Sequence, residues 1–412
     1  MNAHDPVGQP YVELALRINR RAEGFVDGYY GPPERKASID SEPLRPVGAL
    51  RDDAQRLREA IARIEMDAQR RNFLNKQLTA MEMVLRRLAG EDVPYVQEVQ
   101  ACFDITPARV PETEFEEALR ELDTLLPGTG GLAARHLAWK RPFELPNERV
   151  LPLAETALAE VRRRTRAILE LPAGESMELR LVTGQPWSGY NWPLGQGRSR
   201  IEINTDLPVR ADGLVSLMAH EAYPGHHTEC AIKEELWYRQ AGRLEHSLVI
   251  LLAPESALSE GIAMVAQDVI FPDKAELAAW LREVLYPQAG IQVDVELQLR
   301  LAQAAEKLAG ASGNAAFLLC EDRRPDDEIV EYLCHHSLRT EKEARHFLTF
   351  LTAPLSRAYI FNYFYGRRLL LDASARGGML DVFRWVIHDP VTPSAVAARY
   401  GVSTAPANNT GG

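Results

Sequence analysis

A break in a helical segment constrains this chain more than any other feature of its sequence. Residues 220–227 read HEAYPGHH, and apolar residues at 214–219 lead into them like the last turns of a helix. Pro224 removes a backbone donor and clashes with the preceding turn, while Gly225 permits dihedrals that other residues avoid. The helix must therefore bulge or end here. Because such a break is costly, its presence favours a functional role for this segment.

Three of the ten histidines fall within these eight residues, beside Glu221. A neutral imidazole is a good zinc ligand, and an adjacent carboxylate can accept a proton from a metal-activated water. In the HExxH helix of many zinc peptidases the histidines at i and i+4 share one face, but Pro224 occupies i+4 here. In an unbroken helix His226 would lie roughly 240° round from His220, and His227 about 10.5 Å further along the axis. Neither arrangement closes a metal site, so the break must return one histidine to the first.

His226 is the histidine that we expect to return. A bulge beside Gly225 need only rotate the chain by part of a turn to bring it back. His227 would also require the separation along the axis to shorten by about half, so it is the less favoured alternative. The unused imidazole should face the cleft or hydrogen-bond an acid that supports the site.

The pattern HExYPGHH resembles the signature of the domain-of-unknown-function 885 family, whose fold resembles the carboxypeptidase Taq-like (gluzincin) zinc metallopeptidases. That family follows the signature with Glu-Gly-Trp-Ala, and residues 260–263 of this chain read EGIA. It also carries Tyr-x-x-Gly in a late helix, matched here by Tyr363 and Gly366. The resemblance covers residues 175–370 and implies a multi-helix metallopeptidase-like fold.

Two further site residues are suggested by these motifs. Zinc hydrolases commonly combine two histidines with one carboxylate and leave a position open for water. Glu260 lies 34 residues after His226, enough chain for one helix and a returning one. A glutamate on such a helix either faces solvent or reaches the metal, and the motif match favours the metal. Tyr363 either packs in the core or donates to a developing oxyanion.

Composition sets wide limits on the rest. The 412 residues are 46% hydrophobic and 25% charged, as in ordinary globular proteins. A net charge of -11 without a basic block argues against a nucleic-acid partner, and no apolar run is long enough to cross a membrane. The polar first ten residues and four cysteines without a CxxC pair favour a cytoplasmic protein with reduced thiols. The oligomeric state is left open.

Helical periodicity dominates the chain and predicts a mainly α fold. The expected helices cover residues 11–26, 50–64, 71–88, 111–126, 147–171, 254–268, 273–308, 325–338 and 341–371. Alternating residues at 177–182 and 199–204 predict a small antiparallel β-hairpin near the active-site cleft. Such a hairpin either binds extended substrate along its edge or only covers the core.

We expect an N-terminal helical lobe over residues 1–175, a C-terminal helical lobe with the metal site over 176–402, and a disordered tail over 403–412.

The sequence as a whole predicts a zinc-dependent hydrolase that cleaves peptide or related amide bonds. Zinc would be held by His220, His226 and Glu260, with Glu221 as general base and Tyr363 assisting the oxyanion. The alternatives are a metal-dependent hydrolase of a non-peptide substrate, and a non-catalytic helical binding protein.

Overall fold

The computed structural model describes residues 5–353 and 355–405, and within them the mainly α prediction is confirmed. The N-terminal part contains the helices α1 (Gly8–Asn19), α2 (Pro33–Ser41), α3 (Val47–Arg63), α4 (Ala68–Leu88), α5 (Tyr95–Phe103), α6 (Glu112–Leu125), α7 (Leu132–Lys140) and α8 (Asn147–Ile168). The rest contains α9 (Leu214–Glu221), α10 (His226–Lys233), α11 (Pro254–Ile270), α12 (Lys274–Trp280), α13 (Tyr286–Ala289), α14 (Val295–Glu306), α15 (Gly310–Cys320), α16 (Asp326–Ser337), α17 (Glu341–Thr352), α18 (Phe361–Gly377), α19 (Met379–His388) and α20 (Pro393–Tyr400). Wider π-helical turns extend α10 over Glu234–Gln240 and α12 over Leu281–Leu285.

In the part of the chain that the structure describes, five short strands form two small sheets. Strands β2 (Ser176–Val182), β3 (Gly189–Gly195) and β4 (Arg198–Asn204) lie in the order β2-β4-β3, and β1 (Val26–Tyr29) pairs antiparallel with β5 (Leu248–Ile250).

An antiparallel hairpin is present, but its strands are β3 and β4. The two segments expected to form it, β2 and β4, run parallel, so that pairing was wrong. The reason is the tight turn over residues 195–197, where Gly195, Gln196 and Gly197 all have positive φ and fold β3 directly back onto β4.

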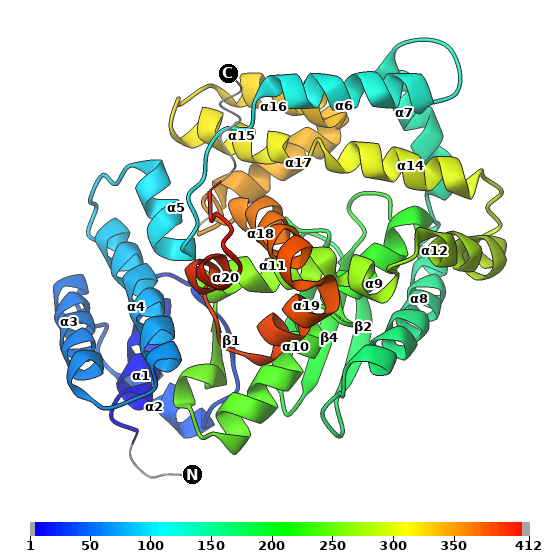
Figure 1. Ribbon diagram of the computed structural model, residues 1–412. Coiled ribbons are helices and arrows are strands. Elements are labelled where there is room, and N and C mark those ends of the chain that lie inside the picture. Colours follow the sequence, from blue (N-terminus) through cyan, green and yellow to red (C-terminus); the bar gives the residue numbers. More distant parts are fainter. Residues whose placement is uncertain (1–4, 354, 406–412) are drawn as a thin grey trace.

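Helices α11 and α18 cross at the centre of the molecule (Figure 1). Two glycines permit the close approach: a Cβ on Gly261 would lie 2.7 Å from the Gly366 carbonyl oxygen, and one on Gly366 would lie 2.3 Å from that of Ala257. Both glycines belong to the motifs singled out in the sequence. Their shared function is to bring the segments around Glu260 and Tyr363 together.

Two expected long helices are interrupted. The helix expected over 273–308 breaks after α13, where Gly290 adopts a left-handed conformation and Asp294 caps the next helix. The helix expected over 341–371 ends at Thr352 and resumes at Phe361. Among the described residues, six helices lie outside the expected ranges: α2, α5, α7, α15, α19 and α20.

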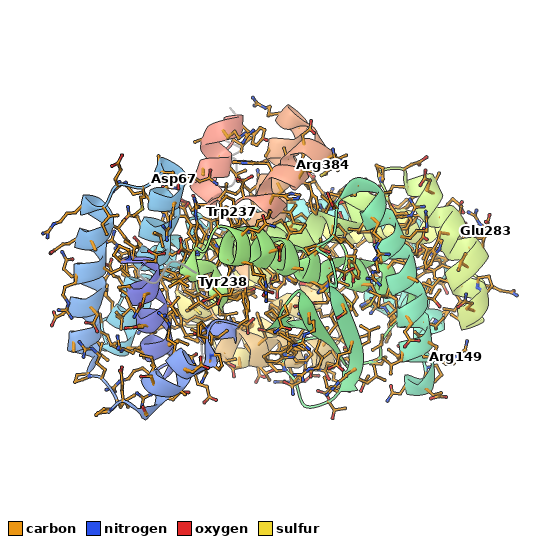
Figure 2. The ribbon with its side chains drawn as sticks, turned by 90° about the horizontal axis from the view of Figure 1, so that it is seen from below. Asp67, Arg149, Trp237, Tyr238, Glu283 and Arg384 are labelled. Carbon is orange, nitrogen blue, oxygen red and sulfur yellow. The ribbon has the colours of Figure 1, made fainter. Side chains whose placement is uncertain are left out.

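The C-terminal helices α19 and α20 lie between two groups of helices. Figure 2 shows α1–α4 on one side, α8 and α12 on the other, and Trp237 and Arg384 near the C-terminal helices. The Trp237 indole donates to the carbonyl of His388 at 2.6 Å, and Arg384 donates to that of Ile168 at 2.9 Å. These bonds tie α19 to both α8 and the extension of α10.

The largest hydrophobic cluster combines residues 7–105 with residues 248–257 and 315–365, and a second combines 143–161 with 201–295. Each cluster therefore contains residues from before and after residue 175. The two-lobe division stays a prediction. Of the predicted disordered tail, residues 406–412 lie outside the described residues. Thr404 accepts a hydrogen bond from Thr106 at 3.1 Å.

Candidate metal centre and its cleft

The break between α9 and α10 returns His226 to His220. Gly225 makes this possible, because a Cβ at this position would lie 1.8 Å from the His220 carbonyl oxygen and 2.5 Å from that of Ala219. Its own N–H donates to the Ala219 carbonyl at 2.9 Å, so the chain folds back onto the end of α9. The two imidazole rings then lie edge to face with centroids 4.8 Å apart.

Glu260 on α11 completes a cluster with these two histidines. One of its carboxylate oxygens lies 3.4 Å from His220 Nε2, and the other lies 3.8 Å from His226 Nε2. One ligand atom from each residue lies within 4.8 Å of the others. The structure thus brings together all three residues that were predicted from the sequence to be metal ligands.

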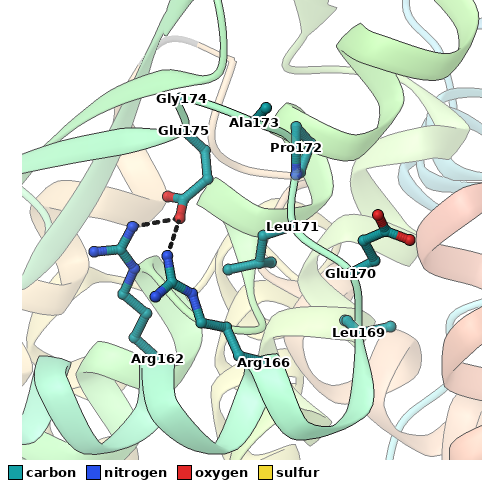
Figure 3. Close-up of a pocket in the computed structure, with 9 residues that line it drawn as sticks. All are labelled: Arg162, Arg166, Leu169, Glu170, Leu171, Pro172, Ala173, Gly174 and Glu175. Carbon is teal, nitrogen blue, oxygen red and sulfur yellow. Dashed lines mark hydrogen bonds and ion pairs between the residues drawn. The ribbon is translucent and has the colours of Figure 1, made fainter.

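His227 points away from this cluster into the protein. Its Nε2 lies 3.0 Å from a carboxylate oxygen of Glu175 and its Nδ1 lies 2.8 Å from the Ser199 hydroxyl. Figure 3 shows Glu175 paired with Arg162 and Arg166 beside a separate surface hollow. Since one ring nitrogen of His227 donates and the other accepts in these two hydrogen bonds, its single ring lone pair is not free for a metal.

The cluster fits a zinc ion on two counts. Zinc binds nitrogen and oxygen ligands at about 2.0–2.2 Å in a tetrahedron, which sets its ligand atoms roughly 3.3–3.6 Å apart. The separations of 3.4 and 3.8 Å, which run to the two different oxygens of Glu260, are close to this range, and one ligand atom from each residue lies within 4.8 Å of the others. In addition, Glu260 Oε2 is buried without a hydrogen-bond partner, which is costly unless something else binds it.

Hydrogen bonds fix the tautomer of His226. The Ser259 hydroxyl donates its only proton to Glu229 at 2.6 Å, so its oxygen must accept from His226 Nδ1 at 3.0 Å. This leaves the lone pair of His226 on Nε2, the atom nearest Glu260. Lys233 in turn donates to Glu229 at 2.7 Å and holds that carboxylate in place.

Glu255 lines the same cleft, where it accepts from Lys233 at 3.1 Å. Asp268, further along α11, pairs with Lys274 and Arg367 and does not line the cleft.

Glu221 and Glu260 are buried together but differ in acidity. Burial raises the pKa of Glu221, because the nearby imidazoles offset only part of its desolvation. Burial also acts to raise the pKa of Glu260, but the imidazoles and the Tyr359 hydroxyl outweigh it and hold that pKa below its ordinary value. One carboxylate is therefore suited to accept a proton and the other to stay ionised as a ligand.

Two tyrosines of the segment 359–363 reach the cluster. Tyr359 donates to Glu260 at 2.6 Å, and the ring of Tyr363 stacks on His220 with centroids 6.4 Å apart. Burial raises the pKa of Tyr363 well above its ordinary value, which keeps its hydroxyl protonated as a donor. Arg367, four residues after Tyr363, pairs with acids on other helices and does not line the cleft.

Sequence reasoning missed Tyr359, although it lies one helical turn before Tyr363 and so could share its face.

The cluster lies in a cleft with a volume of about 340 Å³. Strand β3 forms one wall and contributes Tyr190 and Trp192, whose rings lie 4.7 Å apart between centroids. Strands β1 and β5 contribute to the wall as well, through Asp27 and residues 248–250. The predicted association of the hairpin with the cleft is thus present, through β3.

Within the described residues, no helix is both long and apolar enough to cross a membrane.

Comparisons with known proteins place the fold but not the function. No family model matches the chain, and no curated protein matches it either. Among solved structures, the chain is similar to a putative lipoprotein from Colwellia psychrerythraea, with 17% identity and a TM-score of 0.53 over 94% of this chain and 69% of that one. A putative lipoprotein of unknown function from Shewanella oneidensis is 11% identical, with a TM-score of 0.47 over 95% of this chain and 82% of that one. The first likeness shows a shared fold, and the resemblance to the domain-of-unknown-function 885 family stays a prediction.

Proposed function

We propose that this chain is a zinc-dependent hydrolase that cleaves peptide or related amide bonds. The observation that carries the proposal is the meeting of His220, His226 and Glu260 within 4.8 Å, beside the buried Glu221 and at the wall of a cleft. Three protein ligands are typical of catalytic zinc sites, whereas structural sites are usually closed by four.

Each side chain of the site would have a separate role in the reaction. Zinc held by the three ligands would act as a Lewis acid toward water and the scissile carbonyl. Glu221, whose pKa is raised by burial, accepts the proton of the attacking water and returns it to the leaving amine. The protonated hydroxyl of Tyr363 is available to donate to the oxyanion. Trp187, Tyr190 and Trp192 supply apolar surface for the substrate.

Replacing Glu221 with glutamine tests this division of roles. An amide cannot accept the proton, so Glu221→Gln should keep about one zinc per chain while peptide cleavage falls by about 100-fold or more. Cleavage is read by mass spectrometry on a mixed peptide library, and zinc by elemental analysis. Glu283→Gln, on the exposed extension of α12, is the matched control and should behave like the unmodified chain.

Two results would redirect the proposal. Loss of zinc in Glu221→Gln would make this residue a ligand instead of a base. A zinc-loaded chain that cleaves no peptide would point to a non-peptide substrate or to a binding role.

We also propose a cytoplasmic location, supported by four free cysteines. The structural neighbour from Colwellia psychrerythraea is a putative lipoprotein, which raises the alternative of an anchored protein. Cell fractionation separates the two.

A further inference from the structure

The charges that line the cleft are unbalanced. Its acidic side chains are Asp27, Glu221, Glu229, Glu255 and Glu260. Among the described lining residues, Lys233 is the single Lys or Arg, and its ammonium group is already bound by Glu229 at 2.7 Å and Glu255 at 3.1 Å. A zinc ion would offset the charges of Glu260 and Glu221. The carboxylate of Asp27 would still lack a counter-charge.

Asp27 reaches the cleft from strand β1 and is held in place from β3. The Tyr190 hydroxyl donates to one of its carboxylate oxygens. No Lys, Arg or His among the described residues lies within ion-pair distance of it, although the chain forms many such pairs elsewhere. Asp27 is half-buried, and desolvation raises the pKa of its carboxyl group to about 6. The ionised form is therefore costly without a nearby cation, and a bound cation would remove that cost.

Asn191, on the same wall, offers a second acceptor. Its amide Nδ2 donates to the backbone carbonyl of Glu221 at 2.9 Å, which fixes which end of the amide is oxygen. The side chain is only 7% exposed, and its Oδ1 has no hydrogen-bond partner. The cleft wall beside the general base therefore presents a buried acceptor that only a ligand or a water molecule can satisfy.

We propose that the cleft recognises an ammonium group of its substrate, with Asp27 as the counter-ion and the Asn191 carbonyl oxygen accepting an N–H from the bound molecule. This inference rests on the proposed hydrolase function and names its substrate class: peptides or amides that carry a primary amine near the scissile bond. The amine is an amino-terminal group or a lysine side chain. Recognition of a free carboxyl terminus is disfavoured, because the cleft offers no unpaired cationic side chain from the described residues to bind it.

Binding of matched probes tests the ammonium site without relying on turnover. The protein is the zinc-loaded chain with Glu221→Gln, so that no probe is consumed. Calorimetry compares tetra-alanine amide, its N-acetyl form, and N-acetyl-Ala-Lys-Ala-Ala amide. At least one ammonium probe should bind about tenfold or more tightly than the neutral acetylated tetra-alanine, and adding Asp27→Asn should remove that preference.

The controls separate charge from folding. Asparagine at position 27 can still accept from Tyr190, so the fold should persist, and thermal unfolding checks this. Glu178→Gln removes an exposed carboxylate from β2 of the neighbouring sheet and should leave the preference unchanged. If Asp27→Asn does not fold, the comparison of probes on the parent protein still decides the question.

The outcomes are distinct. Tighter binding of the free-amine probe assigns the site to an amino terminus, and tighter binding of the lysine probe assigns it to a side chain. Equal affinities for all three probes, or a preference that survives Asp27→Asn, would overturn the ammonium site. A chain that prefers ammonium probes but cleaves no peptide would contradict only the hydrolase proposal. A chain that cleaves the free-amine peptide, the acetylated lysine peptide and the acetylated peptide without lysine equally well would contradict only this inference.

Discussion

Substituting Gly225 with alanine tests whether the helix break builds the metal centre. The new methyl group would lie 1.8 Å from the His220 carbonyl oxygen, whereas real Cβ contacts are essentially never shorter than 3.0 Å. The obstacle is backbone on both sides, so the residues around it must separate by more than 1 Å. Metal ligands must be held to within about 0.5 Å, so a shift of this size is at least twice what the site tolerates.

We therefore expect Gly225→Ala to weaken zinc binding by about 100-fold or more and to lower the free energy of unfolding by about 1–3 kcal/mol. Competition with a chromophoric chelator measures the affinity, and urea unfolding of the metal-free chain measures the stability. Gly213→Ala is the matched control, because it lies at the start of α9 and its Cβ would meet nothing within 4 Å. Zinc affinity within about threefold of the unmodified chain would refute the argument.

Three further changes have defined outcomes. Gly366→Ala puts a Cβ 2.3 Å from the Ala257 carbonyl oxygen and should push α18 away from α11. We expect kcat to fall by about tenfold or more while zinc is kept, and unchanged kinetics would contradict this. Ser259→Ala removes the acceptor that fixes the tautomer of His226 and should weaken zinc affinity by about 10–100-fold in chelator competition, so equal affinity would count against that role. His246 has its pKa lowered by burial from 6.5 to about 4, so the unfolded chain binds this proton first as pH falls. The free energy of unfolding should then drop by up to about 3 kcal/mol from pH 6.5 to 4, and His246→Gln should reduce that drop; identical pH profiles in urea unfolding would contradict the assignment.

The parts of the fold that sequence could predict are those fixed by local periodicity. Helices such as α3 and α4 carry regular apolar stripes, and their bounds differ from expectation by three residues or fewer. The β1–β5 pair joins segments of four and three residues that lie more than 200 positions apart, so no local pattern marks it. The parallel pairing of β2 with β4 likewise depends on where β3 inserts, which alternation of side chains does not specify.

The residues of the site also differ in whether a local sequence pattern could predict them. The steric argument at Pro224 and Gly225 was local and predicted which histidine returns to His220. Glu260 was predicted as a ligand only because residues 260–263 match a family motif. Asp27 and the contact of Tyr359 with Glu260 were missed, because the contacts to Tyr190 and Glu260 join residues 163 and 99 positions apart. Such contacts come from the helix crossing and the sheet packing, which are properties of the whole fold.

Zinc content tests the account most directly. The unmodified chain, purified without chelator, incubated with zinc and freed of excess, should hold about one zinc per chain by elemental analysis. His220→Ala should lose that zinc while its circular dichroism stays that of a mainly helical protein, because the imidazole lies at the wall of a cleft and outside the hydrophobic clusters. A metal-free unmodified chain, or a His220→Ala chain that still holds a full equivalent of zinc, would contradict the metal centre on which the proposed function rests.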